Sequence, residues 1–154
     1  MAPAEAPTTR GTPVRQISVF MHNRVGALMS LVKMLHDSRI EVLGLSVQES
    51  TELTIARFVV SDPDTVETLF MEKGIPFDST CVLTVVELRP LEGTLVHCLA
   101  ALLAAEINIH VSYPLLARPG NYPLLALYLD EPDLAGEALS NAGFRVLLQE
   151  DLSR

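Results

Sequence analysis

The chain has 154 residues, of which 49% are hydrophobic and 19% charged, and its formal net charge is −8. This apolar content is enough for a packed core and excludes a wholly disordered chain. The acidic balance, the 5% aromatic content and the lack of Trp argue against a nucleic-acid binder and against a polybasic membrane-surface protein.

The chain begins with residues 1–13, which are mostly Ala, Pro and Thr. They contain no apolar core of a secretory signal, so we expect a mobile tail. No apolar run reaches the roughly 18 residues that a membrane span needs. Cys81 and Cys98 fit neither a disulfide framework nor a zinc-finger spacing, and we interpret them as ordinary thiols in a reducing compartment. We therefore expect a cytoplasmic protein without a membrane partner.

The first half of the chain predicts a strand, a helix that opens at a glycine, two strands joined by a hairpin, a second helix and a short strand. The first helix has one apolar face with i, i+3, i+4, i+7 spacing. The residues of this face are Leu28, Leu31, Val32 and Leu35. The predicted ranges are Val14–Met21, a helix from Gly26, Ile40–Gln48, Leu53–Val60, a helix from Pro63, and Ile75–Ser79.

The second half predicts the same elements in the same order. The corresponding apolar face of its first helix consists of Leu95, Cys98, Leu99 and Leu102. The predicted ranges are Val82–Leu88, a helix from Gly93, Ile107–Tyr113, Leu124–Leu129, a helix from Pro132, and Phe144–Gln149.

The two halves match as an internal repeat. Gly26 recurs as Gly93, and the acidic, proline-containing segment Ser61–Asp64 recurs as Asp130–Asp133. Such a repeat indicates a duplicated structural unit. We expect a mobile tail over residues 1–13, a first unit over residues 14–80 and a second over residues 81–154.

The order β-α-β-β-α-β, found twice, predicts an α+β protein with two ferredoxin-like units in tandem. Each unit should have an antiparallel sheet with both helices on one face. The strand Leu53–Val60 does not alternate cleanly between apolar and polar residues, which indicates cover on its other face too, by a partner sheet or helix layer. Gly44 within the preceding strand indicates a bulge or the close approach of another backbone.

Short motifs at corresponding places in both units resemble the ACT domain family. The segment His22–Leu28 resembles that family's Asp/Asn-Arg-Pro-Gly-x-Leu loop between the first strand and the first helix, and Arg89–Leu95 occupies the same place in the second unit. Ala105–Ile109, Gly143–Val146 and Glu150–Leu152 are similar to segments of stand-alone tandem ACT proteins. The resemblance covers nearly the whole chain.

The resemblance implies a binding site for an amino acid or a similar effector at the first loop, near an interface between units. Asn23 would orient the ligand's amino group. The backbone of Val25, Gly26 and Ala27 would hold its carboxylate at the start of a helix. The implied ligand-binding residues are Asn23, Arg24, Val25, Gly26, Ala27, Leu28 and Asn108.

The sequence departs from the family pattern at both loops. Val25 replaces the usual proline of the first loop. The loop from Arg89 to Gly93 has no Asp or Asn at the position of Asn23, and Glu41 stands where the second unit has Asn108. We therefore expect one good site per chain rather than two.

Structural roles remain open for the same residues. Asn23 is a good helix cap, Arg24 suits a solvated or interface cation, and Asn108 suits the end of a strand. The histidines are scattered, and His22, His36 and His97 have no carboxylate at a ligand spacing, so neither a metal site nor a cofactor is expected.

The sequence predicts a non-catalytic regulatory protein that binds a small effector. No Ser/His/Asp or Cys/His arrangement indicates an enzyme. The alternative is an assembly or protein-interaction module without a ligand, since an unpaired edge strand favours association. The expected partners are a free amino acid or similar effector, a second copy of the chain, and an enzyme regulated in trans. The edge strands near Glu41–Gln48 and Ile109–Tyr113 are the candidate dimer surfaces.

Overall fold

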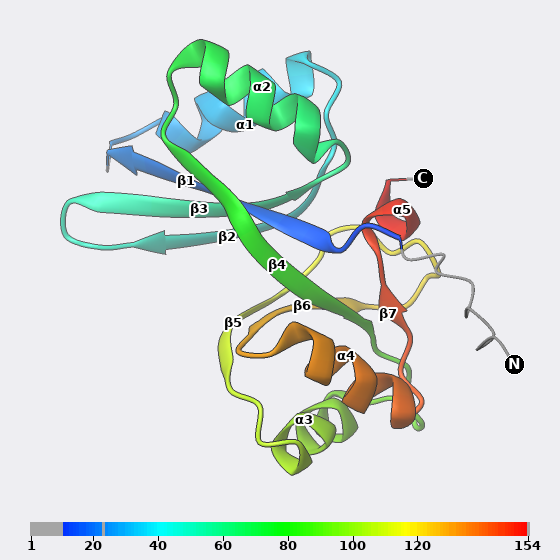
Figure 1. Ribbon diagram of the computed structural model, residues 1–154. Coiled ribbons are helices and arrows are strands. Elements are labelled where there is room, and N and C mark those ends of the chain that lie inside the picture. Colours follow the sequence, from blue (N-terminus) through cyan, green and yellow to red (C-terminus); the bar gives the residue numbers. More distant parts are fainter. Residues whose placement is uncertain (1–10, 23, 154) are drawn as a thin grey trace, which may run out of the picture.

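A computed structural model describes residues 11–22 and 24–153. The chain forms two β-α-β-β-α-β units, as predicted (Figure 1). The elements of the first unit are β1 (Val14–His22), α1 (Ala27–Asp37), β2 (Val42–Glu49), β3 (Leu53–Val60), α2 (Pro63–Lys73) and β4 (Phe77–Glu87). Those that follow are α3 (Leu95–Ala104), β5 (Ile109–Pro114), β6 (Leu124–Leu129), α4 (Pro132–Asn141), β7 (Val146–Leu147) and α5 (Gln149–Leu152).

Strand β4 belongs to both units. The sequence predicts two separate strands here, Ile75–Ser79 and Val82–Leu88, but the structure has one continuous strand. The first part of β4 pairs with β1, as far as Leu83 opposite Val14. From Thr84 onward it pairs with β6 and with the short β7. The sheet order is β2-β3-β1-β4-β6-β5, with all pairs antiparallel, so one strand joins two ferredoxin-like sheets.

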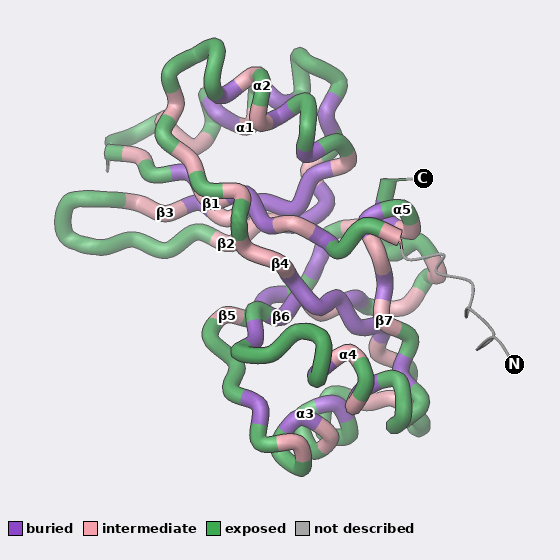
Figure 2. The backbone as a smooth tube through the Cα atoms, in the orientation of Figure 1, coloured by how far each residue is buried: buried purple, intermediate pink, exposed green. Residues whose placement is uncertain are grey.

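The two sheets pack face to face between two helix layers (Figures 1 and 2). A core cluster that includes Ile17, Phe58 and Phe70 lies between α1, α2 and the first sheet. A second, which includes Cys98 and Leu139, lies under α3 and α4. A third combines strand residues from both units with Leu115, just after β5, and Leu152 of α5, and fills the space between the sheets. The cover predicted for the second face of the strand Leu53–Val60 is therefore supplied by the other unit.

Specific contacts join the units across this central core. The Tyr113 hydroxyl of β5 donates to Gln16 Oε1 of β1 at 2.9 Å, and both groups are buried. The amide of Leu116 donates to the Leu43 carbonyl at 2.7 Å. Gly44 pairs with Leu115 in an isolated bridge, and the β2–β3 register shifts beside it, so both roles predicted for this glycine are observed.

The first helix of each unit differs in how its apolar face is covered. In α1, Leu31 and Leu35 are buried, as predicted. In α3, Cys98 and Leu102 are buried, but Leu95 and Leu99 are exposed, so that part of the prediction is wrong. Apolar spacing alone finds a stripe on a helix but does not say whether the same chain covers all of it.

The last part of the predicted tail hydrogen-bonds to the C-terminal segment of the chain. Residues 1–10 lie outside the described residues. The amide of Thr12 donates to the carboxylate of Glu150, and its carbonyl accepts from the amide of Gln149. Within the described residues, no helix is both long and apolar enough to cross a membrane.

Candidate functional site

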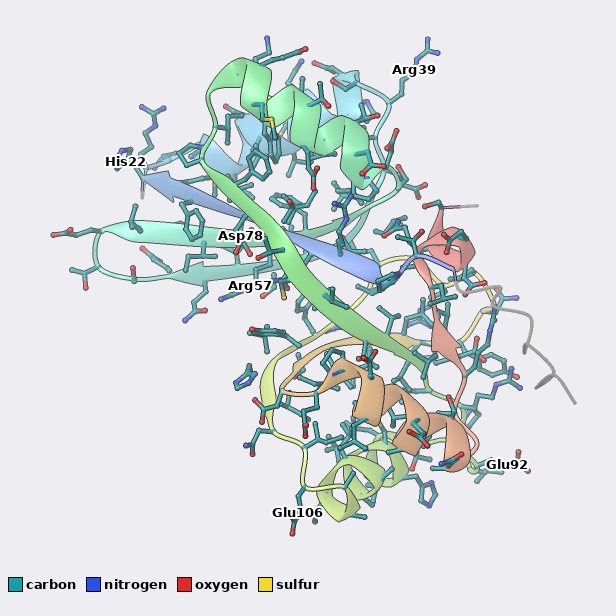
Figure 3. All side chains as sticks on the ribbon, viewed as in Figure 1. His22, Arg39, Arg57, Asp78, Glu92 and Glu106 are labelled. Carbon is teal, nitrogen blue, oxygen red and sulfur yellow. The ribbon has the colours of Figure 1, made fainter. Side chains whose placement is uncertain are left out.

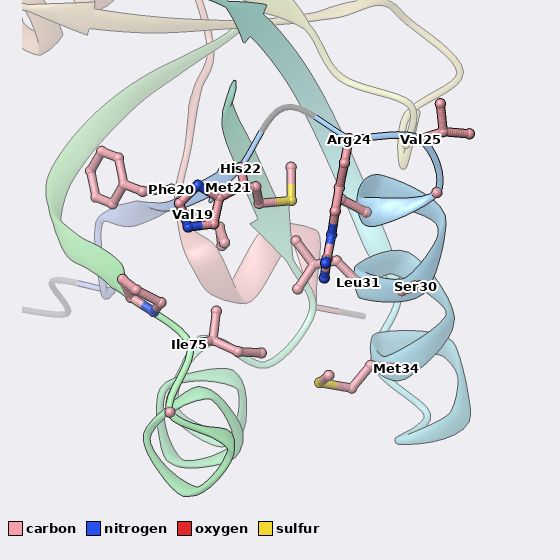
Figure 4. A pocket seen from close by; sticks show the side chains of 14 residues that line it. Val19, Phe20, Met21, His22, Arg24, Val25, Ser30, Leu31, Met34 and Ile75 are labelled. Carbon is pink, nitrogen blue, oxygen red and sulfur yellow. The ribbon is translucent and has the colours of Figure 1, made fainter. Parts of the chain in front are cut away.

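The loop between β1 and α1 forms the mouth of a pocket of about 560 Å³ (Figure 4). The pocket lies between the end of β1, the first two turns of α1 and the turn that leads from α2 into β4. This volume falls within the usual range for small-molecule sites. The lining residues are Val19, Phe20, Met21, His22, Arg24, Val25, Gly26, Ala27, Ser30, Leu31, Met34, Gly74, Ile75 and Pro76.

Four of the seven residues predicted from the loop resemblance line this pocket, namely Arg24, Val25, Gly26 and Ala27. Leu28 lines an adjoining groove of about 190 Å³, which Arg24 and Ala27 also border. Asn23 lies outside the described residues. Asn108 does not line the pocket within one chain. It lies just before β5, where its carbonyl accepts from the amide of Asp130 at 3.3 Å.

Gly26 determines the geometry of the loop. Its φ of 85° places it in the left-handed region, where an L side chain is strained. It caps the start of α1 without a side-chain hydrogen bond, and its carbonyl accepts from the amide of Ser30 at 3.0 Å. Among the described residues, nothing accepts from the amides of Leu28 and Met29 in the first turn. These amides and the helix dipole favour a negative charge at the pocket mouth.

The pocket has a cationic rim and an apolar floor. Arg24 extends from the loop toward Leu31, and Met34 and Ile75 lie farther along the floor (Figure 4). No carboxylate is present among the described residues that line the pocket, although the chain as a whole is acidic. The arrangement therefore suits a small ligand with an anionic end and an apolar end.

The turn Gly74–Pro76 is the part of the site that the sequence analysis missed. The sequence predicts that Ile75 and Pro76 begin a strand, yet together with Gly74 they form one wall of the pocket. The position of this wall can be predicted from the fold, because the ferredoxin-like plan places the last strand of a unit beside the first. In the structure, Phe77 of β4 pairs with Val19 of β1, and the residues before Phe77 therefore lie opposite the loop.

A family model that matches nearly the whole chain decides the family. The model of the ACT domain pair matches residues 12–154. The chain belongs to the ACT domain pair family. A comparison with curated proteins found no significant match.

Solved structures share this fold at low sequence identity. The ACT domain pair described here superposes on protein BT0572 from Bacteroides thetaiotaomicron with a TM-score of 0.83 and 23% identity, covering 94% of this chain and 98% of that one. The regulatory subunit of aspartate kinase from Thermus thermophilus, in a ligand-free form, has a TM-score of 0.57 at 11% identity, with 86% and 94% of the two chains covered. A structure of the aspartokinase alpha and beta subunits has a TM-score of 0.54 at 18% identity, with 84% and 91% covered.

The second loop of the ACT domain pair differs from the first. Arg89 and Gly93 hydrogen-bond to each other through both of their backbone groups, at 2.8 and 3.3 Å, so the loop closes on itself. The Arg89 guanidinium is held by the buried carboxylate of Glu87. Helix α3 is then capped by the Thr94 side chain, which accepts from the amide of His97. The guanidinium of this loop is therefore already paired with a carboxylate, and α3 has a side-chain cap that α1 lacks among the described residues.

The described part of the chain was also compared with the needs of a metal site and of a reactive thiol. The described residues contain no cluster of three or more His, Cys, Asp or Glu side chains that suits a metal ion. Burial raises the pKa of the Cys81 and Cys98 thiols, so the reactive thiolate form is scarce near neutral pH.

Proposed function

We propose that this ACT domain pair binds a free amino acid, or a similar small effector with a carboxylate, in the pocket at the first loop. The observation that carries the proposal is that Arg24, Val25, Gly26 and Ala27, the loop residues that resemble the family motif, line a pocket with no carboxylate among its described residues. An anionic ligand meets a cation there, together with two backbone amides that have no acceptor among the described residues, and the described lining residues include no carboxylate.

The chemistry of the pocket assigns a place to each end of the effector. The carboxylate lies at the start of α1, near the amides of Leu28 and Met29. The side chain points toward Leu31, Met34 and Ile75, which favours an apolar amino acid. Asn23 is assigned to the amino group on the strength of the family resemblance. Asn108 does not line the pocket of its own chain, so a role in binding for Asn108 requires a second copy of the chain.

We further propose that the protein regulates and does not catalyse. Effector binding shifts an equilibrium between states of the chain or its assembly. Two structural neighbours are subunits of aspartate kinases, one of them named as regulatory, which suggests an enzyme target in trans. A cytoplasmic location fits a sensor of free amino acids.

The test is a thermal-shift screen against the twenty amino acids, followed by calorimetry on each hit. A ligand at about 100 times its Kd stabilises the folded state by about 2.7 kcal/mol, which is readily detected. We expect a selective response to one or a few amino acids. A flat response would overturn the proposal and favour the assembly module without a ligand.

Two pairs of variants locate the site once a ligand is found. Gly26→Val should weaken binding at least about 10-fold, because a β-branched residue at this φ forces the loop to move. The matched control is Gly143→Val, which has a φ of 91° and equal open space but lies in the other unit. Arg24→Gln should also weaken binding, whereas Arg39→Gln, on the exposed turn after α1 (Figure 3), should not. If the variant and its control bound the ligand equally tightly in each pair, this loop would not be the binding site.

A further inference from the structure

A second cavity, of about 470 Å³, lies in the cleft between the two units. Strands β1, β3 and β4 form its first wall, which carries Ser18, Arg57 and Asp78. Residues of β5 and β6, among them Val111 and Tyr128, form the second wall. The cleft is separate from the loop pocket, and its volume also falls within the usual range for a small-molecule site.

Three side chains of the first wall form a row across the sheet. Ser18 of β1 lies opposite Arg57 of β3 on one side and opposite Asp78 of β4 on the other (Figure 3). Such cross-strand partners share one face of a sheet. Their neighbours Val19 and Phe77 pack in the core under α1 and α2, so the row points away from the helices. A cation and an anion are thus placed on either side of a hydroxyl group.

The two charged side chains of this row are each held by a neighbour and not by each other. Nη1 of Arg57 donates to Gln48 Oε1 at 3.0 Å. Oδ1 of Asp78 accepts from the amide and from the hydroxyl of Thr80, at 2.8 and 2.7 Å. Within the described residues, Nε and Nη2 of Arg57 and Oδ2 of Asp78 have no hydrogen-bond partner. Both groups are therefore oriented by the protein and retain atoms that can bind a ligand.

A hydrogen-bonded chain of side chains leads from the core to the hydroxyl between the two charges. The Tyr113 hydroxyl donates to Gln16 Oε1 at 2.9 Å, and Gln16 Nε2 donates to Ser18 Oγ at 3.3 Å. Gln16 lines the cleft and is only 3% exposed. Because the Ser18 oxygen accepts here and its proton has no acceptor among the described residues, the hydroxyl can donate to a ligand.

The internal repeat shows that the fold does not require a polar row at this place. The equivalent row of the second sheet consists of Val85 of β4, opposite Ala126 of β6 and Leu147 of β7. All three are buried in the core between the sheets. The first sheet carries two opposite charges and a hydroxyl in the same positions, and these groups border a cavity. Packing of the duplicated fold therefore does not explain them.

We propose that this cleft binds a small zwitterion, a molecule that carries both an ammonium group and a carboxylate. The carboxylate accepts from Arg57 and from the Ser18 hydroxyl, and the ammonium group donates to Asp78 Oδ2. Hydrogen bonds between charged groups are stronger than those between neutral groups. The Cα atoms of Arg57 and Asp78 lie about 10 Å apart, two strand spacings, and the long Arg57 side chain reduces the gap that the ligand spans.

The rest of the cleft favours a ligand with both charges over a simple anion. Phe20 from the first unit and Val111 and Tyr128 from the second give it apolar surface for the remainder of the ligand. Asp130 also lines the cleft, but its carboxylate is paired with His110. The cleft thus offers one cation and one anion that lack an ionic partner among the described residues. The loop pocket differs, because its described lining residues include no carboxylate for an ammonium group.

The test is an NMR titration of the isotope-labelled full chain with each of the twenty amino acids at millimolar concentration. We expect at least one of them to shift the amide signals of Ser18, Arg57 and Asp78. The amide of Leu28 reports on the loop pocket separately. Shifts at the loop alone would overturn the cleft site and leave the proposed function intact. Shifts in the cleft alone would support the cleft and contradict the loop site. If none of the twenty shifted the cleft signals, the proposal would be wrong.

Two pairs of variants test the contacts with the amino acid that the titration identifies. Asp78→Asn and Arg57→Gln should each raise its dissociation constant about 10-fold or more, because each removes a charge-assisted hydrogen bond. The matched controls are Glu72→Gln on the exposed side of α2 and Arg39→Gln on the turn after α1. Both controls should leave the dissociation constant unchanged. Equal losses in the variants and in their controls would show that the row does not hold the ligand.

A ligand analogue tests the assigned orientation on the native chain. The methyl ester of the same amino acid keeps the ammonium group but has no carboxylate, so it should bind at least about 10-fold more weakly than the amino acid. This difference should shrink in Arg57→Gln, because the partner of the carboxylate is already absent. An ester that binds the native chain as tightly as the amino acid would overturn the proposal.

Discussion

Gly44 shows how one small residue lets the two units meet. A Cβ atom at this position would collide with the Leu115 side chain, which is itself buried in the core between the sheets. The close approach allows the bridge between β2 and the segment after β5. Gly44 is therefore fixed by packing between units and not by its own backbone conformation.

Gly44→Ala should destabilise the protein by about 1–3 kcal/mol, because Leu115 must shift within a packed core. The matched control is Gly136→Ala in α4, where a Cβ meets open space. That substitution should stabilise the fold by about 0.5–1 kcal/mol, since alanine favours the helix. Urea denaturation of both variants measures the two effects. A neutral Gly44→Ala would show that the bridge is looser than the structure implies.

Tyr113 and Gln16 form a buried hydrogen bond that also links the units. Burial raises the pKa of the Tyr113 hydroxyl far above its usual value, so it remains a donor across the accessible pH range. Tyr113→Phe leaves the buried Gln16 oxygen without this donor and should cost about 1–3 kcal/mol. Urea denaturation measures the loss. A double variant with Gln16→Leu should recover part of it, and a double variant less stable than Tyr113→Phe would contradict this account.

At the scale of elements, the sequence predicts most of the fold. Prolines at 63 and 132 begin α2 and α4 as expected, because proline suits the first helical position.

The continuous strand β4 was not predicted, because the repeat suggested a boundary between two strands near residue 80. No glycine or proline lies between Pro76 and Pro90, so nothing in the local sequence turns the chain there. The expected strand Phe144–Gln149 is short because the Asp151 carboxylate accepts from the Leu148 amide and begins α5.

The end of β4 carries a buried charge that two arginines hold. Glu87 is 2% exposed and accepts from Arg89 at 2.8 Å and from Arg145 at 3.5 Å. Removing a partner from a buried charge costs up to about 3–5 kcal/mol, and the exposure of both guanidinium groups reduces that figure. Because Arg89 makes the shorter contact, we expect Arg89→Ala to lower the free energy of unfolding more than Arg145→Ala does. Urea denaturation measures the free energy of unfolding of both variants. A larger loss for Arg145→Ala than for Arg89→Ala would contradict the assigned contacts.

At the scale of the whole molecule, the candidate site was predicted only in part. The loop residues were available from a local motif, because a glycine with positive φ and a helix start are encoded within a few positions. The wall Gly74–Pro76 comes from a distant segment that strand pairing brings to the loop. Leu95 and Leu99 of α3 were expected on a buried face but are exposed, since helical spacing alone does not say how much of an apolar face the rest of the chain covers.

Several carboxyl groups with lowered pKa values make the stability of the folded chain depend on pH in the acid range. His110 beside Asp130 holds the pKa of that carboxyl below its usual value, and the amide and hydroxyl of Thr80 do the same for Asp78. The unfolded chain therefore binds protons more readily than the folded chain in this range. The contribution to stability is fully present above about pH 4, the ordinary range of these groups, and is lost as the pH falls through the lowered pKa values.

We expect the free energy of unfolding to be nearly constant from neutral pH down to about pH 5 and to fall below about pH 4. Asp130→Asn removes one of these groups, so its curve should lie below that of the native chain at neutral pH and converge with it in acid. Asp133→Asn, on the exposed first turn of α4, removes the same charge and controls for the change in net charge. Urea denaturation across the pH series measures all three. If stability rose on acidification, relief of the −8 net charge would outweigh the paired carboxylates, and the assigned direction would be wrong.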